Sequence, residues 1–385
     1  MDSFFSKYLS GFIPVPFILQ TTDGTTNIGK GEPQFTVTLK KDISKKELLA
    51  STTLALGEAY MRGDLEVDRD LYEVLDLFLG QIDKFAYNQS ALKNIITSSL
   101  SKGNQKKEVS SHYDIGNDFY KLWLDETMNY SCAYFKTEHD SLYDAQVQKA
   151  DHILEKLHLQ KGMKLLDIGC GWGFLLLRAA KEYGVHGTGL TLSQEQYNHF
   201  SDVIKQENMT DLLEVKLLDY RELKHSKMEF DRVVSVGMLE HVGRGNYDLF
   251  LENVEAVLKP KGLFLLHYIS GREEHLGDAW IKKYIFPGGV IPSLREIINL
   301  LPDYNFNTLD VESLRRHYNR TLLCWLENYR KCKTTVREMY EEEFVRMWEI
   351  YLAASAAAFN NGNIDLHQIL MSKGINNQLP MLRAV

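Results

Sequence analysis

The chain has 385 residues, which is long for one domain and suits one large domain together with a smaller one. Hydrophobic residues make up 44% and charged residues 25%, ordinary values for a globular protein, so disorder along the whole chain is excluded. The net charge of −8 argues against nucleic acid as a partner.

Residues 1–97 predict a small N-terminal domain of mixed, mainly helical structure. Its first 20 residues lack a basic segment, and two prolines interrupt the apolar run, so they do not resemble a signal peptide. Gln34–Leu39 (QFTVTL) alternates as a strand does. Lys46–Tyr60 and Asp70–Leu79 have apolar residues three and four apart, as amphipathic helices do. These residues indicate no chemistry.

Lysines gather at two places in this part of the chain: Lys40, Lys41, Lys45 and Lys46, and then Lys102, Lys106 and Lys107. Such runs are usually solvated faces. The alternative is contact with anionic lipid head groups, where each nearby basic residue contributes about 1 kcal/mol. The second cluster lies in residues 98–111, a polar stretch rich in Ser and Lys, which predicts a linker.

Residues 112–385 predict a large α/β domain. Short apolar strands alternate with helices, and this spacing indicates a parallel sheet that is covered by helices on both faces. Such sheets bind ligands beyond the carboxyl ends of their strands. The predicted strands are Lys164–Asp167, Val185–Leu190, Leu213–Leu217, Asp231–Val236 and Leu263–His267, and the predicted helices are Phe174–Tyr183, Gln194–Glu207 and Tyr247–Leu258.

A glycine-rich turn follows the first of these strands, in Leu165–Gly173 (LLDIGCGWG). Glycines permit positive φ angles and close approach of the backbone to a ligand, although similar turns also occur for structural reasons alone. A dinucleotide site needs G-x-G-x-x-G and a carboxylate about 20 residues later. Here the spacing is G-x-G-x-G, and the next strand ends in Thr191–Ser193 without an acid, which argues against a nicotinamide cofactor.

The turn instead resembles the nucleotide-binding turn of class I S-adenosylmethionine-dependent methyltransferases, in which an acidic residue, here Asp167, lies near the methionine end. Further motifs lie in register with it: HYDIGND at 112–118, NYSCAY at 129–134, TLSQEQ at 191–196, FDRVVSVGMLEHVG at 230–243, LLHYI at 265–269, WIKKYIFPGGVIPS at 280–293 and HYNRTL at 317–322. With these motifs, the chain from Val109 to Gly374 resembles a cyclopropane-fatty-acyl-phospholipid synthase, a group that includes the mycolic acid cyclopropane synthases. The resemblance implies a Rossmann-like, doubly wound sheet and a catalytic domain over residues 112–385.

The resemblance also implies which residues bind S-adenosylmethionine. The methionine end is expected at Tyr130, Ser131, Asp167, Gly169 and Gly171. The ribose and adenine are expected at Thr191, Leu192 and Gln196, with Asp219 and Tyr220 beside the adenine ring. The missing acid after the second strand is shared within this family.

The implied reaction transfers a methylene to a cis double bond through a carbocation, which a bound bicarbonate deprotonates. The positions that match the bicarbonate ligands are Cys132, Glu240, His267, Ile269 and Tyr318. Backbone groups at Cys132 and Ile269, the His267 ring and the Tyr318 hydroxyl suit an anion. The Glu240 carboxylate would repel it unless the two share a proton, so Glu240 is expected to accept the hydrogen of bicarbonate and pass it outward.

Each of these residues also has a structural explanation. Cys132 by itself is typical of a small buried hydrophobe, so its main chain is expected to matter rather than its thiol. His267 ends an apolar strand, where a hydrogen-bonded core histidine is common. His241 is expected to give a supporting hydrogen bond, and Tyr318 is distinguished only by the HYNRTL context. Ser355 stands where family members often carry cysteine, and we expect that thiol to be dispensable.

The implied substrate is an unsaturated acyl chain of a membrane phospholipid. Trp280–Pro292, with Lys282 and Lys283, suits an interfacial loop, and an ordinary packed lid is the alternative. By family analogy, the N-terminal domain supplies a membrane or homodimer contact. The four cysteines lack metal or disulfide spacing, which predicts no metal site and a reducing cytoplasm. With the substrate that the resemblance implies, the protein is expected in the cytoplasm, peripherally at the inner face of the membrane.

Two other functions stay open from the sequence. The first is methylation of a lipid without ring closure, which gives a branched, methylene or hydroxylated product. The second is a membrane-bound S-adenosylmethionine sensor without turnover, against which the presence of Glu240, His267 and Tyr318 argues.

Overall fold

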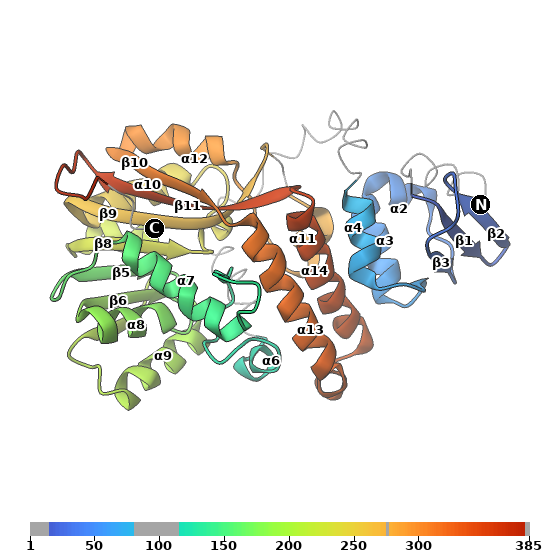
Figure 1. The fold of residues 1–385 in the computed structure, drawn as a ribbon, viewed down its shortest axis with the longest axis horizontal. Coiled ribbons are helices and arrows are strands. Elements are labelled where there is room, and N and C mark those ends of the chain that lie inside the picture. Colours follow the sequence, from blue (N-terminus) through green and yellow to red (C-terminus); the bar gives the residue numbers. More distant parts are fainter. Residues whose placement is uncertain (1–14, 81–114, 275–276, 382–385) are drawn as a thin grey trace. The chain divides into compact units, whose positions relative to one another are not determined.

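The computed structural model describes residues 15–80, 115–274 and 277–381 (Figure 1). Their contacts divide the chain into two compact units. The first comprises the described residues within Met1–Ser98, Leu276–Pro287 and Asn319–Asn363, and the second those within Ser99–His275, Gly288–Tyr318 and Ile364–Val385. The sequence placed all of residues 112–385 in one domain, whereas the contacts assign two segments of that range to the first unit. The expected linker, 98–111, and the second lysine cluster lie outside the described residues.

The first unit contains a four-stranded sheet in the order β2-β1-β3-β4. Its strands are β1 Phe17–Thr21, β2 Gly24–Ile28, β3 Thr36–Leu39 and β4 Leu65–Val67. Only the third of these was predicted, because β4 has three residues and β2 (GTTNI) is polar and almost wholly exposed. The rings of Phe17 and Phe35 stack at 5.4 Å, and Phe78 meets both edge-on in the core of this unit.

Three helices follow this sheet: α2 Lys45–Ala50, α3 Thr52–Met61 and α4 Leu71–Leu79. The single helix predicted over Lys46–Tyr60 is wrong, because the backbone of Ser51 is extended, with φ −161° and ψ 111°. The Ser51 hydroxyl accepts a hydrogen bond from Leu54 N (3.3 Å) and so caps the second helix. In the first lysine cluster, Lys40 pairs with Glu66 and Lys41 with Asp64.

The first unit also holds α11 Ala279–Tyr284, α14 Glu342–Asn360 and most of α13 Arg315–Met339. The Trp280 ring is buried against α3, where a Cβ on Gly57 would lie only 2.4 Å from it. The indole N–H donates to Met61 Sδ (3.3 Å), and Lys283 pairs with Glu58 (2.6 Å). Trp280 is therefore not the exposed interfacial anchor that an interfacial loop would need.

The second unit is built on a seven-stranded sheet in the order β10-β11-β9-β8-β5-β6-β7. Neighbouring strands from β7 to β9 are parallel, and β11 runs antiparallel to both of its neighbours. The strands are β5 Lys164–Ile168, β6 His186–Thr191, β7 Leu213–Leu217, β8 Phe230–Val236, β9 Leu258–Gly271, β10 Phe306–Ser313 and β11 Ile364–Lys373. The strand order reverses between β5 and β8, and such a reversal opens a crevice for a ligand.

Helices cover both faces of this sheet (Figure 1). Side chains alternate along β5, so that Leu165 faces the core formed with α7, α8 and α9, whereas Leu166 and Ile168 face the core formed with α10 and α12. The doubly wound α/β fold predicted from the sequence is therefore confirmed. The helices are α6 Asn117–Lys121, α7 Leu142–Lys156, α8 Phe174–Tyr183, α9 Gln194–Gln206, α10 Tyr247–Val257 and α12 Leu294–Leu300, with 3-10 turns at Tyr220–His225, Leu239–His241 and Leu301–Tyr304.

Within the described ranges, no helix combines the length and the apolar character that crossing a bilayer requires.

Candidate active site

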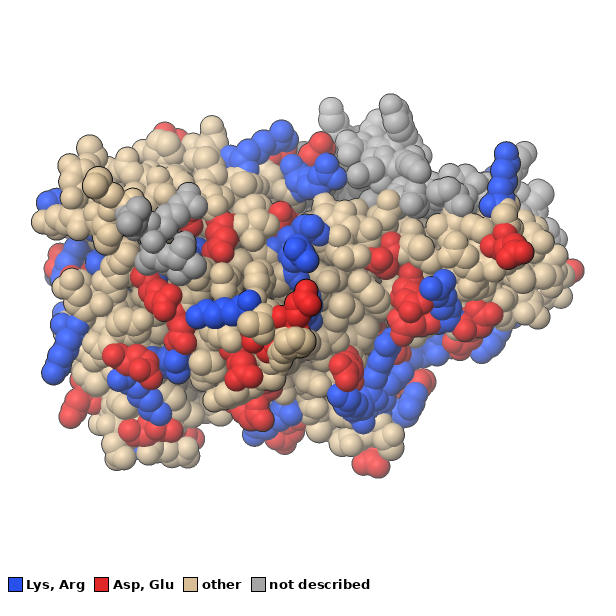
Figure 2. All heavy atoms as spheres, viewed as in Figure 1, with Lys and Arg blue, Asp and Glu red and all other residues tan. Residues whose placement is uncertain are grey.

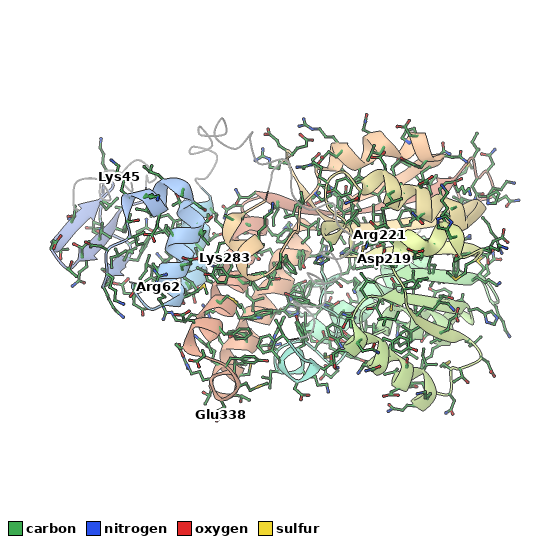
Figure 3. The ribbon with its side chains drawn as sticks, turned by 180° about the vertical axis from the view of Figure 1, so that it is seen from behind. Lys45, Arg62, Asp219, Arg221, Lys283 and Glu338 are labelled. Carbon is green, nitrogen blue, oxygen red and sulfur yellow. The ribbon has the colours of Figure 1, made fainter. Side chains whose placement is uncertain are left out.

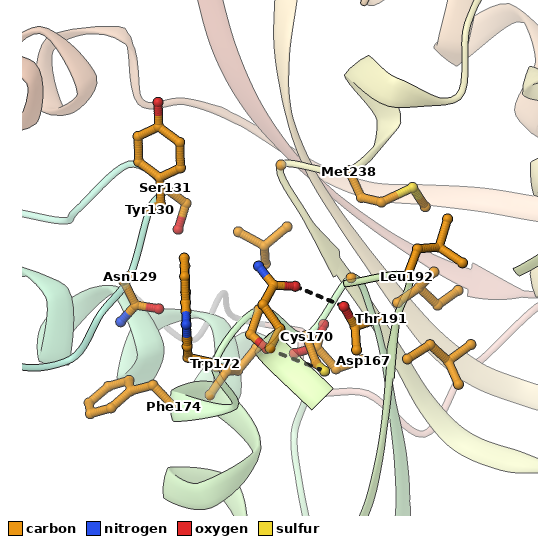
Figure 4. Close-up of a pocket in the computed structure, with 18 of the residues that line it drawn as sticks. Asn129, Tyr130, Ser131, Asp167, Cys170, Trp172, Phe174, Thr191, Leu192 and Met238 are labelled. Carbon is orange, nitrogen blue, oxygen red and sulfur yellow. Dashed lines mark hydrogen bonds between the residues drawn. The ribbon is translucent and has the colours of Figure 1, made fainter. Parts of the chain in front are cut away.

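A pocket lies at the carboxyl ends of β5, β6 and β8 in the second unit (Figure 4). Every residue that the resemblance assigned to the cofactor lines it, namely Tyr130, Ser131, Asp167, Gly169, Gly171, Thr191, Leu192, Gln196, Asp219 and Tyr220. They come from four separate stretches of the chain, 130–131, 167–171, 191–196 and 219–220. The fold thus gathers around one cavity the positions that the motifs indicated one by one.

The glycine turn forms the floor of this pocket, between β5 and α8. Gly171 and Gly173 have φ angles of +56° and +91°, which favour glycine. A Cβ on Gly171 would meet no atom within 4 Å, so the space above it is open. A Cβ on Gly173 would lie 2.1 Å from the Phe200 ring. The two glycines therefore serve different needs, since Gly171 keeps the pocket open and Gly173 permits close packing on α9.

A buried carboxyl and a buried ammonium face this floor. Asp167 is 3% exposed, and its Oδ1 has no hydrogen-bond partner among the described residues. Burial raises the pKa of Asp167 to about 7, and Lys149 opposes that rise. Lys149 on α7 is also 3% exposed, and its Nζ donates to Ser131 Oγ (3.1 Å). Burial lowers the pKa of Lys149 to about 8.

The sequence analysis missed Lys149, although a signal was present. On α7 it lies four residues after Ala145 and four before Ile153, both of which are completely buried. A lysine in the apolar stripe of a helix is unusual, because burying its charge is costly unless a partner is near. Ser131 and Asp167 meet that need here.

The side of the pocket that the resemblance assigned to the nucleoside is held by short polar contacts. Thr191 Oγ1 donates to Gln196 Oε1 (2.8 Å), which ties the end of β6 to the first turn of α9. Asp219 accepts hydrogen bonds from Arg221 N (3.0 Å) and Nε (2.8 Å), and the two side chains form an ion pair (Figure 3). Arg221, which the sequence analysis did not single out, therefore balances the charge of Asp219.

Aromatic rings form the opposite wall. The Tyr120 ring lies 5.5 Å from that of Trp172 and 5.4 Å from that of Tyr130. The Trp172 indole N–H donates to Asn117 Oδ1 (2.8 Å), and Asn117 begins α6. This contact explains part of the HYDIGND motif, whose first three residues lie outside the described residues. The motif supports the glycine turn from the side.

Glu240 lies beside the pocket, next to the lining residue His241. Its Oε1 accepts a hydrogen bond from Ile269 N (2.6 Å), whereas its Oε2 has no partner among the described residues. Burial raises the pKa of Glu240 to about 7, and the bond from Ile269 opposes this rise. Burial lowers the pKa of His241 to about 4, so that this ring is uncharged at neutral pH.

His267 lies two residues before Ile269 on β9, and its side chain is completely buried. Its Nδ1 lies 3.2 Å from Gln368 Nε2, and its Nε2 has no hydrogen-bond partner among the described residues. Burial and the nearby Lys149 and Lys156 hold the pKa of His267 well below its usual value, so the ring is neutral. Its carbonyl oxygen accepts a hydrogen bond from Gly237 N (2.8 Å) at the pocket wall.

Cys132 and Tyr318 meet at one carbonyl group. Cys132 is completely buried, and its thiol donates to Ala133 O (3.2 Å) and lies 3.9 Å from Leu314 O. Tyr318 N donates to the same Leu314 oxygen (3.0 Å) in the first turn of α13. Ser355, in contrast, lies on α14 of the first unit and is partly buried.

Within the described chain, none of the five predicted catalytic residues lines the cofactor pocket itself. The structure places three of them at its border, with Glu240 next to His241, Cys132 next to Ser131, and His267 bonded to Gly237. Ile269 is linked to this border through Glu240, and Tyr318 through the Leu314 carbonyl that it shares with Cys132. The sequence analysis expected backbone groups of Ile269 to suit an anion. In the structure the Ile269 N–H donates to Glu240 and so holds that carboxyl group in place.

Comparison with known proteins agrees with this arrangement. The mycolic acid cyclopropane synthetase family matches residues 100–369, and a domain of unknown function matches residues 4–90. The cyclopropane-fatty-acyl-phospholipid synthase of Escherichia coli (strain K12) is 39% identical over 88% of both chains. A probable fatty acid methyltransferase of Pseudomonas putida is 36% identical over 93% of this chain and 92% of its own.

Among solved structures, a mycolic acid cyclopropane synthase, CmaA1, in complex with S-adenosylhomocysteine (SAH) and CTAB is 35% identical, with a TM-score of 0.66 over 70% of this chain and 98% of that one. The fold, the pocket and these relatives agree on a class I methyltransferase that uses S-adenosylmethionine. The chain therefore belongs to the mycolic acid cyclopropane synthetase family of S-adenosylmethionine-dependent methyltransferases.

Proposed function

We propose that this enzyme transfers a methylene from S-adenosylmethionine to the cis double bond of unsaturated acyl chains in membrane phospholipids and forms a cyclopropane ring. The similarity to the synthase of Escherichia coli along 88% of both chains supports the substrate. The observation that carries the proposal is a pair of buried groups at the border of the cofactor pocket. Glu240 and His267 each have one polar atom without a partner among the described residues.

The pocket fits S-adenosylmethionine on two observations. Asp167 Oδ1 is buried and unpartnered among the described residues, which suits the ammonium group of the methionine end. The open space above Gly171 leaves room for the ligand. The proposed ligands are Tyr130, Ser131, Asp167, Gly169 and Gly171 at the methionine end, and Thr191, Leu192, Gln196, Asp219 and Tyr220 at the nucleoside. Bound there, S-adenosylmethionine supplies a methyl group on a positively charged sulfur.

The border residues fit bicarbonate, which is both a hydrogen-bond donor and an anion. Glu240 Oε2 is a free acceptor among the described groups, and His267 Nε2 is a second unpartnered polar atom. Bicarbonate would be held by Glu240, His267, Tyr318 and the main chain at Cys132, and it would supply the base for the proton that ring closure releases. Ile269 acts through Glu240, because its N–H orients that carboxyl group.

Proton movement is then assigned to Glu240 Oε2. A pKa of about 7 places this carboxyl group where it can both accept and release a proton near neutral pH. The neutral His267 ring adds no positive charge to the site. Because it is completely buried, it offers a polar ring nitrogen that is shielded from water. Water is excluded on this side, since Cys132 and His267 are completely buried.

A phospholipid substrate also requires contact with a membrane. We propose that this chain binds at the inner face of the membrane and that it forms a homodimer. On the face shown in Figure 2, Lys and Arg are interspersed with Asp and Glu rather than gathered in one field. Trp280 is buried, so it does not take part in the proposed contact as an exposed anchor. The proposed location of the protein is the cytoplasm, in peripheral association with the membrane that holds its substrate.

A second function is methylation without ring closure, and the similarity to the probable fatty acid methyltransferase of Pseudomonas putida favours it. The two reactions differ in whether the added carbon closes onto the former double bond. The first reaction therefore gives a three-membered ring, and the second gives a branched, methylene or hydroxylated chain.

The test is to incubate the full chain with S-adenosylmethionine and vesicles of phospholipid that carries cis-unsaturated chains, with saturated vesicles as the control. We expect acyl chains heavier by one CH₂ group and without a double bond, together with released S-adenosylhomocysteine. A heavier product that keeps an alkene would establish the second function instead. Vesicle binding without release of S-adenosylhomocysteine would establish a sensor.

A further inference from the structure

A buried chain of polar side chains runs from an acidic cluster to His267. Lys156, at the end of α7, is paired with Glu312 and lies 3.6 Å from Asp310. Its Nζ also donates to Gln368 Oε1 (2.9 Å) on β11. Gln368 Nε2 then lies 3.2 Å from His267 Nδ1. Gln368 is completely buried and Lys156 nearly so.

The chemistry of these groups allows one direction of hydrogen bonding. A lysine ammonium only donates, so the atom of Gln368 that faces Lys156 must be the amide oxygen. The amide nitrogen therefore faces His267, and an NH₂ group also only donates. His267 Nδ1 must accept this bond. A neutral imidazole with an accepting Nδ1 carries its proton on Nε2.

We infer that Lys156 and Gln368 are positioning residues that hold His267 in the tautomer with its proton on Nε2. This Nε2–H has no partner among the described residues, so it is a buried donor that is available to an acceptor such as the proposed bicarbonate. The opposite tautomer would set two N–H groups against each other at Gln368 and leave a lone pair on Nε2. The consequence for turnover rests on the proposed function, whereas the tautomer itself does not.

Glu312, in the acidic cluster, carries the charge at the start of this series of hydrogen-bonded side chains. Glu312 accepts hydrogen bonds from Lys156 and from His152 Nε2 (2.7 Å). Burial would raise the pKa of Glu312, but these two bonds outweigh it and lower the pKa to about 2. The His152 ring stacks on Tyr134 at 4.2 Å, which holds it in place. Glu312 is therefore a carboxylate at neutral pH, and Lys156 is its ammonium partner.

The direct test is nitrogen NMR of the full-length chain labelled with ¹⁵N-histidine, with the His267 signals assigned by comparison with His267→Asn. We expect Nδ1 of His267 to resonate as an unprotonated imidazole nitrogen and Nε2 as a protonated one. This measurement uses no lipid, so it stands apart from the proposed function. An unprotonated Nε2 in the wild-type chain would overturn the inference.

Gln368→Glu sharpens the test with almost no change in volume. The carboxylate still accepts from Lys156, but it cannot donate to Nδ1, so we expect the proton to move to Nδ1. The double variant Gln368→Glu/Glu312→Gln has the wild-type charge in the cluster, and we expect the same wrong tautomer. Restoration of the wild-type signals by the second change would show that charge, and not hydrogen-bond direction, governs the tautomer.

Glu312→Gln alone is the matched control, because it removes a charge and leaves the bond from Lys156 to Gln368. We expect it to keep the wild-type tautomer. In the vesicle assay, Gln368→Glu should lose at least tenfold in kcat with little change in S-adenosylmethionine affinity. Lys156→Met, which frees the amide to turn over, should give signals of both tautomers, and unchanged wild-type signals in that variant would contradict the role of Lys156.

Discussion

Glu240 shows how burial prepares one side chain for chemistry. One oxygen is held by Ile269 N, and the other has no partner among the described residues. A carboxyl group in this state is costly to keep charged, which is why its pKa is raised to about 7. A purely structural carboxyl group would have both oxygens satisfied. The unpaired oxygen therefore supports the ligand role that we propose for Glu240.

Glu240→Gln is expected to lower kcat by at least a hundredfold, because an amide cannot take up the proton that we assign to Oε2. The affinity for S-adenosylmethionine should change by less than threefold, since Glu240 does not line the cofactor pocket. Vesicle turnover and calorimetric titration with S-adenosylmethionine would measure the two effects. A loss of affinity as large as the loss of rate would contradict the assigned role.

The same substitution should stabilise the protein at high pH. The pKa of Glu240 rises from 4.5 to about 7 on folding, so between these values the folded state binds more protons and stability falls as pH rises. At about 1.4 kcal/mol for each pKa unit, the wild type loses about 3 kcal/mol by pH 8. Glu240→Gln should therefore unfold later than the wild type in denaturant at pH 8, and the gap should close near pH 4. An equal gap at both pH values would exclude this origin.

Lys149 donates to Ser131, and its positive charge opposes the rise in the pKa of the buried Asp167. Lys149→Met removes both the charge and the bond to Ser131, so we expect S-adenosylmethionine to bind at least tenfold more weakly. Lys149→Gln keeps a donor for Ser131 without the charge, and it separates the two contributions. Titration calorimetry would measure the affinities. Wild-type affinity in Lys149→Met would show that this lysine serves folding alone.

At the scale of elements, the turn between β5 and α8 combines two demands in a few residues. Its backbone must reverse direction with positive φ angles, and it must leave space above it. Gly169 N and Cys170 N both donate to Leu190 O on β6 (3.0 and 2.9 Å), which fixes the turn against the next strand. A rigid turn keeps the pocket open without a bound ligand.

Gly171→Val should abolish detectable binding of S-adenosylmethionine, because the new side chain projects into the open space of the pocket. The positive φ angle also costs stability, so a control with the same strain is needed. Gly162→Val provides it, since Gly162 has φ +81° and open space but lies outside the pocket lining. Titration of both variants would compare them, and equal losses of affinity would assign the effect to strain.

At the scale of the whole molecule, the chain builds two units and interleaves their segments. The pocket-lining residues all lie in the second unit, whereas α3, α11 and α14 lie in the first. The contacts of α11 with α3 join segments more than 200 positions apart in the sequence, such as Lys283 with Glu58. The stability of the first unit should therefore be separable from cofactor binding.

Gly57→Leu tests this separation. The larger side chain would overlap the Trp280 ring, and overpacking of this kind costs about 1–3 kcal/mol. The unfolding temperature should fall, while the affinity for S-adenosylmethionine stays within twofold of the wild type. Thermal unfolding and calorimetric titration would measure both. A tenfold loss of affinity would show that the units are coupled.

The sequence by itself determined the five parallel strands and three of the helices of the second unit, and it indicated the chemistry of its turn. The bounds of α8 and β7 agree with their predictions, because helical and strand periodicity reflects contacts within a few residues. The residues expected to bind the cofactor could be predicted for a similar reason, since short motifs such as DIGCGWG hold their information in adjacent positions, and they line one pocket. The break at Ser51 was missed, because one extended residue hardly disturbs an amphipathic pattern.

Only the tertiary structure decided which distant side chains meet. β11 was not predicted. Its residue Gln368 lies opposite His267 on the neighbouring antiparallel strand β9 and contacts the His267 ring. Lys149 on α7 reaches Ser131 in the loop before that helix, and the N–H of Ile269 donates to Glu240. The physical reason is that burial and the direction of a hydrogen bond depend on neighbours far away in the chain. The periodicity of apolar residues in the sequence does not indicate those neighbours, because they are brought together only when the chain folds.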